Sequence, residues 1–529
     1  MSTLSVLPVY TVRDIREIER QCLPGAQPPL MERAGCAAAR DAARLIESRP
    51  GPVLVACGPG NNGGDGFVLA RELLRHGREA VVAFAGDPAR LPEDAARARA
   101  SFLHAGGKTF ADLPPAPENG WALVVDALFG IGLQRPIVGQ YRDWIGALDA
   151  ISAPRLAVDV PSGLDADTGR VPGVCFRATH TTTFIALKPG LLTLDGPDYC
   201  GEISFQSIGI DPSAHVAAAG WRVAPEIFSA WLVPRPRNAH KGMYGDAGVL
   251  GGDIGMTGAA LLAARAALLL GAGRVYAGIL DPGAPACDPA HPELMLRPAG
   301  QLPARLDALA AGPGLGTGAR ARHLLQEAIG RDISLLLDAD ALNIVSRDPA
   351  LAEALAARQA ATVLTPHPAE AGRLLAVPTD EIQADRRAAA LELARRYRAC
   401  TVLKGCGSLI ATPEGRWYIN TTGHSGMASA GMGDVLSGLV LALLAQGWPA
   451  GMALIAGVHL HGAAAGRLAR AGIGPVGLGA SETIIAAREV FNDWLCADPS
   501  VSQGRLAETG GIRDQESPIP DSRGLTLNK

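Results

Sequence analysis

The sequence predicts an α/β protein of two domains, each built on a parallel sheet that helices cover on both faces. With 529 residues the chain exceeds a single typical core, and short apolar strand segments alternate with helical segments along it. This alternation begins twice, and the proline-rich residues 231–236 separate the two series. We therefore expect domains at residues 1–232 and 238–496, a linker at 233–237, and a disordered polar tail at 497–529.

Composition restricts the classes of ligand. The formal net charge of -4 gives no field that would attract nucleic acid or an acidic membrane surface. The N-terminus lacks the pattern of a signal peptide, and the most apolar segments, residues 258–273 and 435–445, are too short to span a membrane. Nine scattered cysteines without a CxxC pair indicate a reduced chain. We expect a cytoplasmic homo-oligomer that binds small molecules, and neither nucleic acid nor a membrane.

The first half opens with two helices and continues with strands. Thr11 and Asp14 form a capping-box pattern that predicts a helix to about Cys22, and residues 30–46 predict a second helix. Apolar segments then predict strands at residues 53–57, 80–85, 122–127, 156–160 and 182–187. The first strand leads into the loop GPGNNGGDG, residues 58–66, and then a helix at 67–76.

Polar side chains gather where these strands end, which is where parallel sheets bind their ligands. Those that follow the first, third and fourth strands are Asn61, Asn62, Asp65, Asp126, Asp159 and Ser162. Each of them also fits a cap or turn. The oxygens of Asn62, Asp126 and Ser162 suit an alkali or alkaline-earth cation, and the glycine loop beside them offers amides that suit an anion.

The glycine loop also raises the alternative of an NAD dehydrogenase. Gly58, Gly60 and Gly63 satisfy GxGxxG between a strand and a helix, and Asp87 follows the second strand. Against this alternative, the loop carries two asparagines and a further Gly-Asp-Gly, so we expect a wider turn than the dinucleotide fingerprint needs. Asp87 lies between a glycine and a proline, where a role in a turn is equally reasonable.

The second half repeats the alternation with its own loops. Residues 240–253 lead into a glycine-bearing strand, and residues 257–270 predict a long apolar helix. Further strands are expected at residues 275–280, 309–311, 335–337, 362–364 and 401–403. The last four of these strands run into GPGLG, DADALN, TPHPAE and KGCGS. The strand ends of this half therefore also collect glycines and polar side chains.

Residues 426–438, GMASAGMGDVLSG, combine small residues with one carboxylate at the start of an apolar helix. Backbone amides without bulky side chains, together with a helix N-terminus near Asp434, suit a phosphate. Asp434 would take a proton from a hydroxyl while the amides stabilise a transferring phosphoryl group. The alternative is a glycine turn in which Asp434 is an ordinary N-cap.

Other strand-end residues of this half have two interpretations each. Asp338 and Asp340 suit Mg²⁺ held through water, or they cap the following helix. His367 is held between two prolines that stiffen its backbone, or it is a structural or solvated histidine. Lys404 is a candidate phosphate ligand, or a solvent-exposed lysine.

The motifs together resemble two known families. GPGNNGGDG, VDALFGIGL, VDVPSGLDAD and ALKPG resemble the NAD(P)H-hydrate epimerase family. HKGMYG, GPGLG, LDADALN, TPHPAE, VLKG and GMGDVLSG resemble the ADP-dependent NAD(P)H-hydrate dehydratase family, a branch of the ribokinase-like superfamily. The tandem order is similar to that of the bifunctional NAD(P)H-hydrate repair enzymes and covers nearly all of residues 1–495. This resemblance implies an N-terminal Rossmann-like three-layer sandwich and a C-terminal ribokinase-like α/β domain.

The resemblance further implies a two-step repair of NADH or NADPH that carries an added water. The first half would equilibrate the R and S epimers of NADHX and NADPHX and would bind K⁺. The second half would dehydrate the S epimer with ADP as cosubstrate and Mg²⁺ as cofactor, releasing AMP and phosphate. Whether ADP or ATP is used, and which hydrate is preferred, stay open.

In the first half the resemblance implies two catalytic residues, Asp159 and Lys188, and three K⁺ ligands, Asn62, Asp126 and Ser162. The hydrate would be bound by Asp159 and by the loop residues Asn61, Asn62, Gly63, Gly64, Asp65, Gly130, Ile131, Gly132, Leu133, Gln134, Arg135 and Pro136. A noncatalytic nucleotide-binding module is the alternative for this half.

In the second half the resemblance implies Asp434 as the catalytic base. The hydrate site would be lined by Ala259, Gly314, His367 and Asp434. The adenine nucleotide would be held by Lys404, Gly405, Cys406, Gly407, Ser408 and Gly433. A sugar or vitamin kinase, which would leave a stable phosphorylated product, is the alternative.

Overall fold

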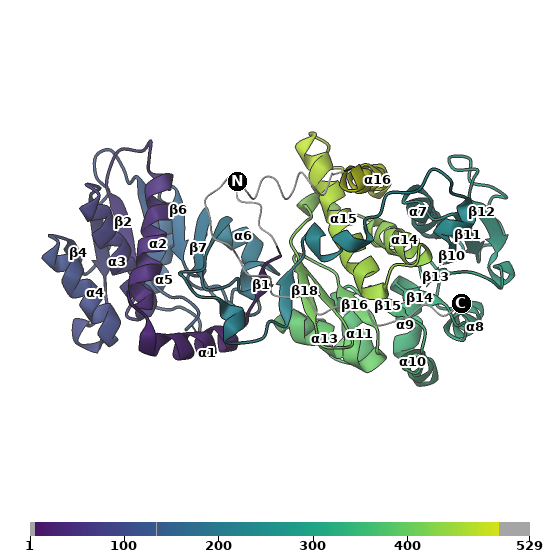
Figure 1. The fold of residues 1–529 in the computed structure, drawn as a ribbon, viewed down its shortest axis with the longest axis horizontal. Coiled ribbons are helices and arrows are strands. Elements are labelled where there is room, and N and C mark those ends of the chain that lie inside the picture. Colours follow the sequence, from purple (N-terminus) through teal and green to yellow (C-terminus); the bar gives the residue numbers. More distant parts are fainter. Residues whose placement is uncertain (1–5, 134, 497–529) are drawn as a thin grey trace.

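The computed structural model describes residues 6–133 and 135–496, which form two α/β sheets side by side along the long axis of the molecule (Figure 1). The predicted α/β class with two sheets is confirmed. The expected disorder of residues 497–529 lies outside the described residues, as does Gln134. Within the described part of the chain, no helix is both long and apolar enough to cross a bilayer.

The first sheet has seven parallel strands in the order β4-β3-β2-β5-β6-β7-β8. The strands are β2 (Val53–Cys57), β3 (Ala80–Phe84), β4 (Lys108–Phe110), β5 (Leu123–Ala127), β6 (Arg155–Val158), β7 (His180–Phe184) and β8 (Glu202–Gln206). The chain first builds outward from β2 to β4 and then restarts on the other side at β5. This reversal is the Rossmann-like switch point, where open parallel sheets bind ligands.

Helices cover both faces of this sheet. The helices of this half are α1 (Val12–Cys22), α2 (Leu30–Leu45), α3 (Asn61–Arg75), α4 (Glu93–His104), α5 (Gln140–Asp149) and the short α6 (Gly196–Cys200). Val55 faces the core under the first four helices, whereas its neighbour Leu54 packs with Trp144 of α5. Because successive residues of a strand point to opposite faces, β2 must be apolar throughout.

The second sheet has eleven strands in the order β1-β9-β18-β17-β16-β15-β14-β13-β10-β11-β12. They are β1 (Pro8–Val9), β9 (Gly220–Arg222), β10 (Asp246–Gly251), β11 (Arg274–Ile279), β12 (Met295–Pro298), β13 (Ala308–Ala311), β14 (Ser334–Leu337), β15 (Thr362–Leu364), β16 (Cys400–Leu403), β17 (Ser408–Ala411) and β18 (Trp417–Asn420). The strands from β16 to β12 are parallel, and β17 is antiparallel to both of its neighbours.

Two groups of helices cover the second sheet. One face packs against α7 (Thr257–Leu269), α14 (Met432–Ala445), α15 (Ala450–Arg470) and α16 (Ala480–Cys496). The other face packs against α8 (Ala319–Ile329), α9 (Ala339–Arg347), α10 (Pro349–Ala356), α11 (Pro368–Leu375), α12 (Thr379–Ala384) and α13 (Arg386–Tyr397). α14 is buried along most of its length between the sheet and its helical neighbours, so its sequence is apolar on all sides.

The two halves share one sheet edge and part of one core. β9 of the first half pairs parallel to β18, and β1 pairs antiparallel to β9, so β1 lies between the two lobes in Figure 1. Leu187 and Leu192 of the first half lie in the same buried cluster as Trp417 and Ile419 of the second. The interface between the halves is therefore built like a protein interior.

Candidate active sites

A cavity of about 130 Å³ lies beside the carboxyl ends of the first-sheet strands. Of the residues that the sequence singled out, Asn61, Asp65, Ile131, Asp159 and Lys188 line it. α1 also contributes to the wall. The residues of the predicted strand-end site of the first half thus line a pocket that has room for a small chemical group, next to the switch point of the sheet.

Lys188 and Asp159 form a buried ion pair in this cavity. The Lys188 ammonium, 1% exposed, donates to Asp159 Oδ1 at 2.6 Å, to Thr183 Oγ1 at 2.8 Å and to the Phe184 carbonyl at 2.8 Å. Asp159 and Ile185 both hold φ at 68°, which is an uncommon conformation for a β-branched residue such as Ile185. Local backbone strain of this kind persists where the surroundings impose it, and it clusters at functional sites.

Asn62, Gly130 and Asp159 converge beside this pair. A Cβ atom placed on Gly130 would lie 3.2 Å from Asn62 Oδ1 and 3.2 Å from Asp159 Oδ2. The buried Asn62 Nδ2 has no hydrogen-bond partner among the described residues. An unused buried donor is costly, so this amide suits a ligand that brings an acceptor.

Two further carboxyl groups surround the ion pair. Burial, and then the charge of Asp159, raise the pKa of Asp65 well above its usual value, and the same two causes raise the pKa of Glu19. Both groups therefore favour the protonated form more than free carboxyl groups do. Glu19 was missed by sequence reasoning, because a charged residue in an amphipathic helix gives no sign that it faces a cavity.

Asp126 and Ser162 lie against each other at the predicted cation site. Ser162 donates from its backbone N–H to Asp126 Oδ2 at 2.7 Å and from Oγ to Asp126 Oδ1 at 2.6 Å. Phe129 N–H donates to Ser162 Oγ at 2.8 Å, and Gly130, the next residue, lies against Asn62. The three predicted ligands, Asn62, Asp126 and Ser162, thus all lie around residues 128–130.

The chemistry of these groups fits a hard cation of the alkali or alkaline-earth kind. Burial raises the pKa of Asp126 to about 6, although hydrogen bonds from Ser162 and Leu128 oppose this rise. A cation nearby would favour the charged carboxylate, and the donor set consists of hard oxygens. No cluster of three or more His, Cys, Asp or Glu side chains suited to a metal occurs in the described ranges.

The glycine loop differs from the expectation. The predicted wide turn is wrong, because α3 begins at Asn61 directly after its N-cap, Gly60. The helix starts this early because Gly63 packs on the preceding backbone: a Cβ there would lie 2.0 Å from the Gly58 carbonyl oxygen. Asp87 accepts a hydrogen bond from Ala89 N–H at 2.9 Å in a turn, which favours the turn role over a ribose contact.

The remaining predicted residues of this half are spread more widely. Gly64 packs against the Met31 side chain of α2. Leu133 packs against the core on the α5 face of the sheet. Gly132, Arg135 and Pro136 are exposed on the loop that follows β5.

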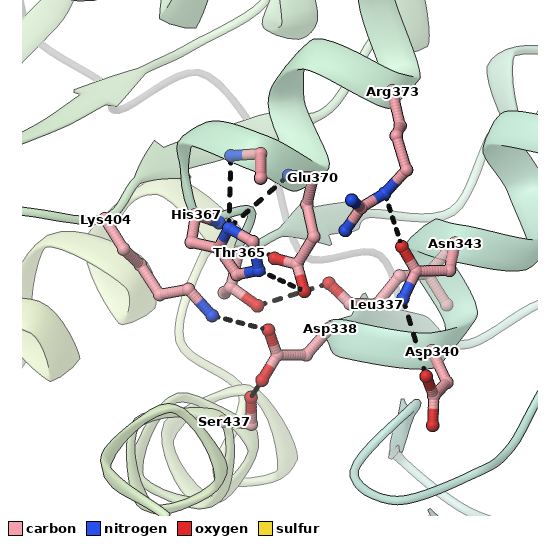
Figure 2. A network of polar contacts seen from close by, with 11 residues as sticks. Leu337, Asp338, Asp340, Asn343, Thr365, His367, Glu370, Arg373, Lys404 and Ser437 are labelled. Atoms are coloured by element: carbon pink, nitrogen blue, oxygen red, sulfur yellow. Dashed lines mark hydrogen bonds and ion pairs between the residues drawn. The ribbon is translucent and has the colours of Figure 1, made fainter. Parts of the chain in front are cut away.

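The site of the second half centres on Asp338, which follows β14 (Figure 2). Lys404 Nζ donates to Asp338 Oδ1 at 2.8 Å, and Ser437 Oγ of α14 donates to Asp338 Oδ2 at 2.8 Å. The interpretation of Lys404 as a solvent lysine is therefore wrong. Asp338 occupies the N-cap position of α9 but forms no side-chain cap bond, because its carboxylate binds Lys404 and Ser437 instead.

His367 and Glu370 form the capping box of α11. His367 Nδ1 accepts from Glu370 N–H at 3.4 Å, and Glu370 Oε2 accepts from His367 N–H at 2.8 Å. The second Glu370 oxygen lies 3.2 Å from His367 Nε2 (Figure 2). Sequence reasoning named His367 and missed Glu370, although the spacing in HPAE matches a capping box with histidine at its first position.

Asp434 is not the N-cap of α14. The cap is Gly431, whose φ of 86° is left-handed, and it makes no side-chain cap bond. Asp434 lies in the first turn, where burial and then the charge of Asp338 raise its pKa to about 6, while Lys404 lowers it. A Cβ placed on Gly433 would lie 3.2 Å from Lys404 Nζ. Asp434 therefore favours its protonated form more than a free carboxyl group does, and Lys404 Nζ lies beside the residue that precedes it.

The other predicted residues approach the same edge of the sheet. Gly314 lies against the start of α7, because a Cβ there would be 3.2 Å from Ala259 Cβ. Gly316 N–H donates to Asp340 Oδ2 at 2.9 Å. Asp338 and Asp340 thus both accept hydrogen bonds from the chain at this edge.

The loop from Lys404 to Ser408 is held from within the second half. Arg386, 2% exposed, donates to the carbonyls of Leu403 and Lys404 at 3.3 Å each. Ser408 Oγ donates to the Gly405 carbonyl at 2.9 Å. Gly405 and Cys406 are exposed, so the predicted nucleotide loop is fixed at its base by residues of the second half and reaches the protein surface.

Fold and sites define two tandem α/β units, each with acid–base groups and glycine-bearing loops at its strand ends. Residues 247–484 match the family described as NAD(P)H-hydrate dehydratase, and residues 27–190 match the family described as YjeF-related protein N-terminus. The bifunctional NAD(P)H-hydrate repair enzyme Nnr of Coxiella burnetii is 38% identical and covers 92% of this chain and 99% of its own. That of Escherichia coli (strain K12) is 39% identical and covers 92% and 94%.

Among solved structures, the ADP/ATP-dependent NAD(P)H-hydrate dehydratase from Bacillus subtilis is 31% identical, with a TM-score of 0.46, and covers 51% of this chain and 97% of its own. Because these relatives match over nearly the whole chain, this chain belongs to the family of bifunctional NAD(P)H-hydrate repair enzymes.

Proposed function

We propose that this chain repairs hydrated NADH and NADPH in two steps. Residues 1–232 interconvert the R and S epimers of NADHX and NADPHX, and residues 238–496 dehydrate the S epimer with ADP, releasing AMP and phosphate. Family membership supports the pair of activities, and the two strand-end sites supply suitable groups for each. The cytoplasmic location and the homo-oligomer stay predictions.

The first step needs an acid and a base at one carbon. The hydrate carries its hydroxyl on C6, which is also bonded to the ring nitrogen. Inversion there requires the C–O bond to break, with a proton delivered to the leaving oxygen, and then to re-form from the other face. Asp159 and Lys188 supply a paired base and acid at the cavity wall, and Asn62 offers its unused amide donor to the substrate.

K⁺ would be held by Asn62, Asp126 and Ser162 and would supply a fixed positive charge beside the hydrate. The chain itself contributes the orientation of these oxygens. Ser162 fixes both oxygens of Asp126, and the loop at Gly130 leaves space between Asn62 and Asp159.

The second step converts a poor leaving group into a good one. Asp434 takes the proton of the C6 hydroxyl as its oxygen attacks the β-phosphorus of ADP and AMP departs. The C6–O bond then breaks with its electrons on phosphate, and loss of a proton from the neighbouring carbon restores the ring double bond. A positioned base contributes about 10² to 10⁴ in rate. Lys404 places a cation at the phosphates, where Mg²⁺ would add further charge stabilisation.

The observation that carries this proposal is the position of Asp434. It lies in the first turn of α14, its pKa is raised to about 6, and Lys404 Nζ lies beside the preceding residue, Gly433. A base with that pKa next to a cation at a helix N-terminus is what transfer of a phosphoryl group to a hydroxyl requires.

The test mixes purified protein, both NADHX epimers, K⁺, Mg²⁺ and ADP and follows the dihydronicotinamide absorbance together with AMP and phosphate. We expect complete recovery of NADH, with one AMP and one phosphate released per NADH formed. A stable phosphorylated product without recovery of NADH would identify a kinase instead. No recovery with either ADP or ATP would refute the proposal.

A further inference from the structure

Residues 193 and 194 of the first half form hydrogen bonds to the predicted nucleotide loop of the second half, residues 404–408. Thr193, 2% exposed, shares its hydroxyl proton between the Cys406 carbonyl at 3.1 Å and the Gly407 carbonyl at 2.9 Å. Leu194 N–H donates to the Cys406 carbonyl at 3.1 Å. Two successive carbonyls of the nucleotide loop are therefore held by residues more than two hundred positions earlier in the chain.

The backbone at Gly407 lies too close to the backbone of residues 192 and 193 for any side chain at position 407. Its φ is 59°, and a Cβ there would lie 2.0 Å from the Leu192 carbonyl oxygen and 2.5 Å from Thr193 Cα. Glycine is required on both counts, because the conformation is left-handed and the backbones touch. The shape of the loop thus depends on the first half.

The orientation of the held carbonyls matters for an anion. In a trans peptide the N–H points opposite to the C=O. Because the Cys406 carbonyl faces Thr193, the Gly407 amide faces away from the first half. On the same loop, Lys404 turns its ammonium toward Asp338, close to Gly433. Releasing the carbonyls would let this amide rotate away from its present direction.

We propose that Thr193 is a positioning residue for nucleotide binding: it holds residues 404–408 in the conformation that accepts the diphosphate of ADP. The inference rests on the proposed function and deepens it, because it makes one active site depend on a residue of the other half. Thr193 follows Lys188 by five residues, and the 3-10 helix η3 (Pro189–Leu191) connects the two. The same short segment therefore reaches both sites.

The experiment uses the full-length chain and three variants. Thr193→Val removes the hydroxyl and keeps the shape, and Thr193→Ser restores the hydroxyl. Thr181→Val is the matched control, because Thr181 is equally buried in the first half and donates at 2.7 Å to the Cys200 carbonyl, away from the loop. Each protein is given pure S epimer, so that kcat and the KM for ADP report the second half alone.

We expect Thr193→Val to raise the KM for ADP about three- to tenfold, as for the loss of one buried hydrogen bond, with kcat changed less than about twofold. Thr193→Ser and Thr181→Val should keep the KM of the unsubstituted protein. An unchanged KM in Thr193→Val would overturn the inference, and so would an equal rise in Thr181→Val, which would show a general loss of stability.

A second measurement serves if Thr193→Val does not fold. Hydrogen exchange of the unsubstituted protein is followed at residues 192–194 with and without saturating ADP. We expect ADP to slow exchange at the Leu194 amide, since that amide bonds to the loop, and unchanged exchange would overturn the inference. If the unsubstituted protein shows no ADP-dependent dehydration at all, the proposed function itself fails, which is a distinct result.

Discussion

The Lys404 ammonium lies 2.8 Å from the Asp338 carboxylate, and this pair sets the charge of the second active site. Burial opposes the charged form of Lys404, but Asp338, then Glu370 and Asp434, raise its pKa above the usual value. Lys404 is therefore a cation throughout the physiological range of pH. Asp338 is 1% exposed, so its charge acts on Asp434 with little screening by solvent.

Replacing Lys404 separates its two roles. We expect Lys404→Met to raise the KM for ADP at least tenfold and to lower the free energy of unfolding by about 3 kcal/mol, because Asp338 would be left as an unpaired buried charge. Urea denaturation and initial rates measure the two effects. The double variant Asp338→Asn/Lys404→Met should regain stability but not ADP binding. An unchanged KM for ADP in Lys404→Met would contradict the role assigned to Lys404.

The dehydration rate should report the pKa of Asp434. A base must be ionised to act, and the pKa of Asp434 is raised to about 6. We expect log kcat/KM on the S epimer to rise with unit slope below about pH 6 and to level off above it. Asp338→Asn removes a negative charge that raises this pKa, so the inflection should move to lower pH. A shift to higher pH would show that another group is titrating.

Lys188→Met should uncouple the two steps. The Asp159–Lys188 pair is buried in the first-half cavity, and we expect its loss to slow epimerisation about 100-fold or more. Given both epimers and ADP, the variant should recover NADH only up to the share of S epimer, apart from uncatalysed exchange. Pure S epimer, the control, should be dehydrated at the unsubstituted rate. Full recovery from the mixture at the normal rate would remove Lys188 from the mechanism.

The fold was predictable where burial alone decides it. β2 and β15 have the predicted bounds, because strands covered on both faces must be continuous apolar runs. β4 and β8 were missed, since each is short or partly exposed and lacks such a run. The pairing of β9 with β18 was also beyond reach: Gly220 lies under Trp417, and a glycine gives no sign of a partner so distant in the chain.

The candidate sites, like the fold, were only partly predictable from the sequence. The strand-end positions of Asp126 and Asp159, and the position of Asp434 at the start of an apolar helix, follow from the sequence pattern. The pairing of Lys404 with Asp338 depends on which strand ends become neighbours, and the approach of Glu19 to the cavity depends on how α1 packs. Local patterns in the sequence do not reveal these long-range contacts.

Cation dependence tests the first-half site. If Asn62, Asp126 and Ser162 hold K⁺, epimerisation should increase with K⁺ and saturate, and tetramethylammonium should not substitute. Asp126→Asn should weaken the apparent K⁺ affinity more than about tenfold, because the buried carboxylate supplies the negative charge. Dehydration of pure S epimer is the internal control. Epimerisation that is equally fast in K⁺ and in tetramethylammonium would refute the site.

The most direct test of the central claim is the dehydration rate of Asp434→Asn on pure S-NADHX with saturating ADP and Mg²⁺. Asparagine keeps the size of the side chain but cannot accept the hydroxyl proton. We predict a fall in kcat of about 10² to 10⁴, with ADP binding retained when measured by calorimetry. A variant that recovers NADH at the unsubstituted rate would contradict the account.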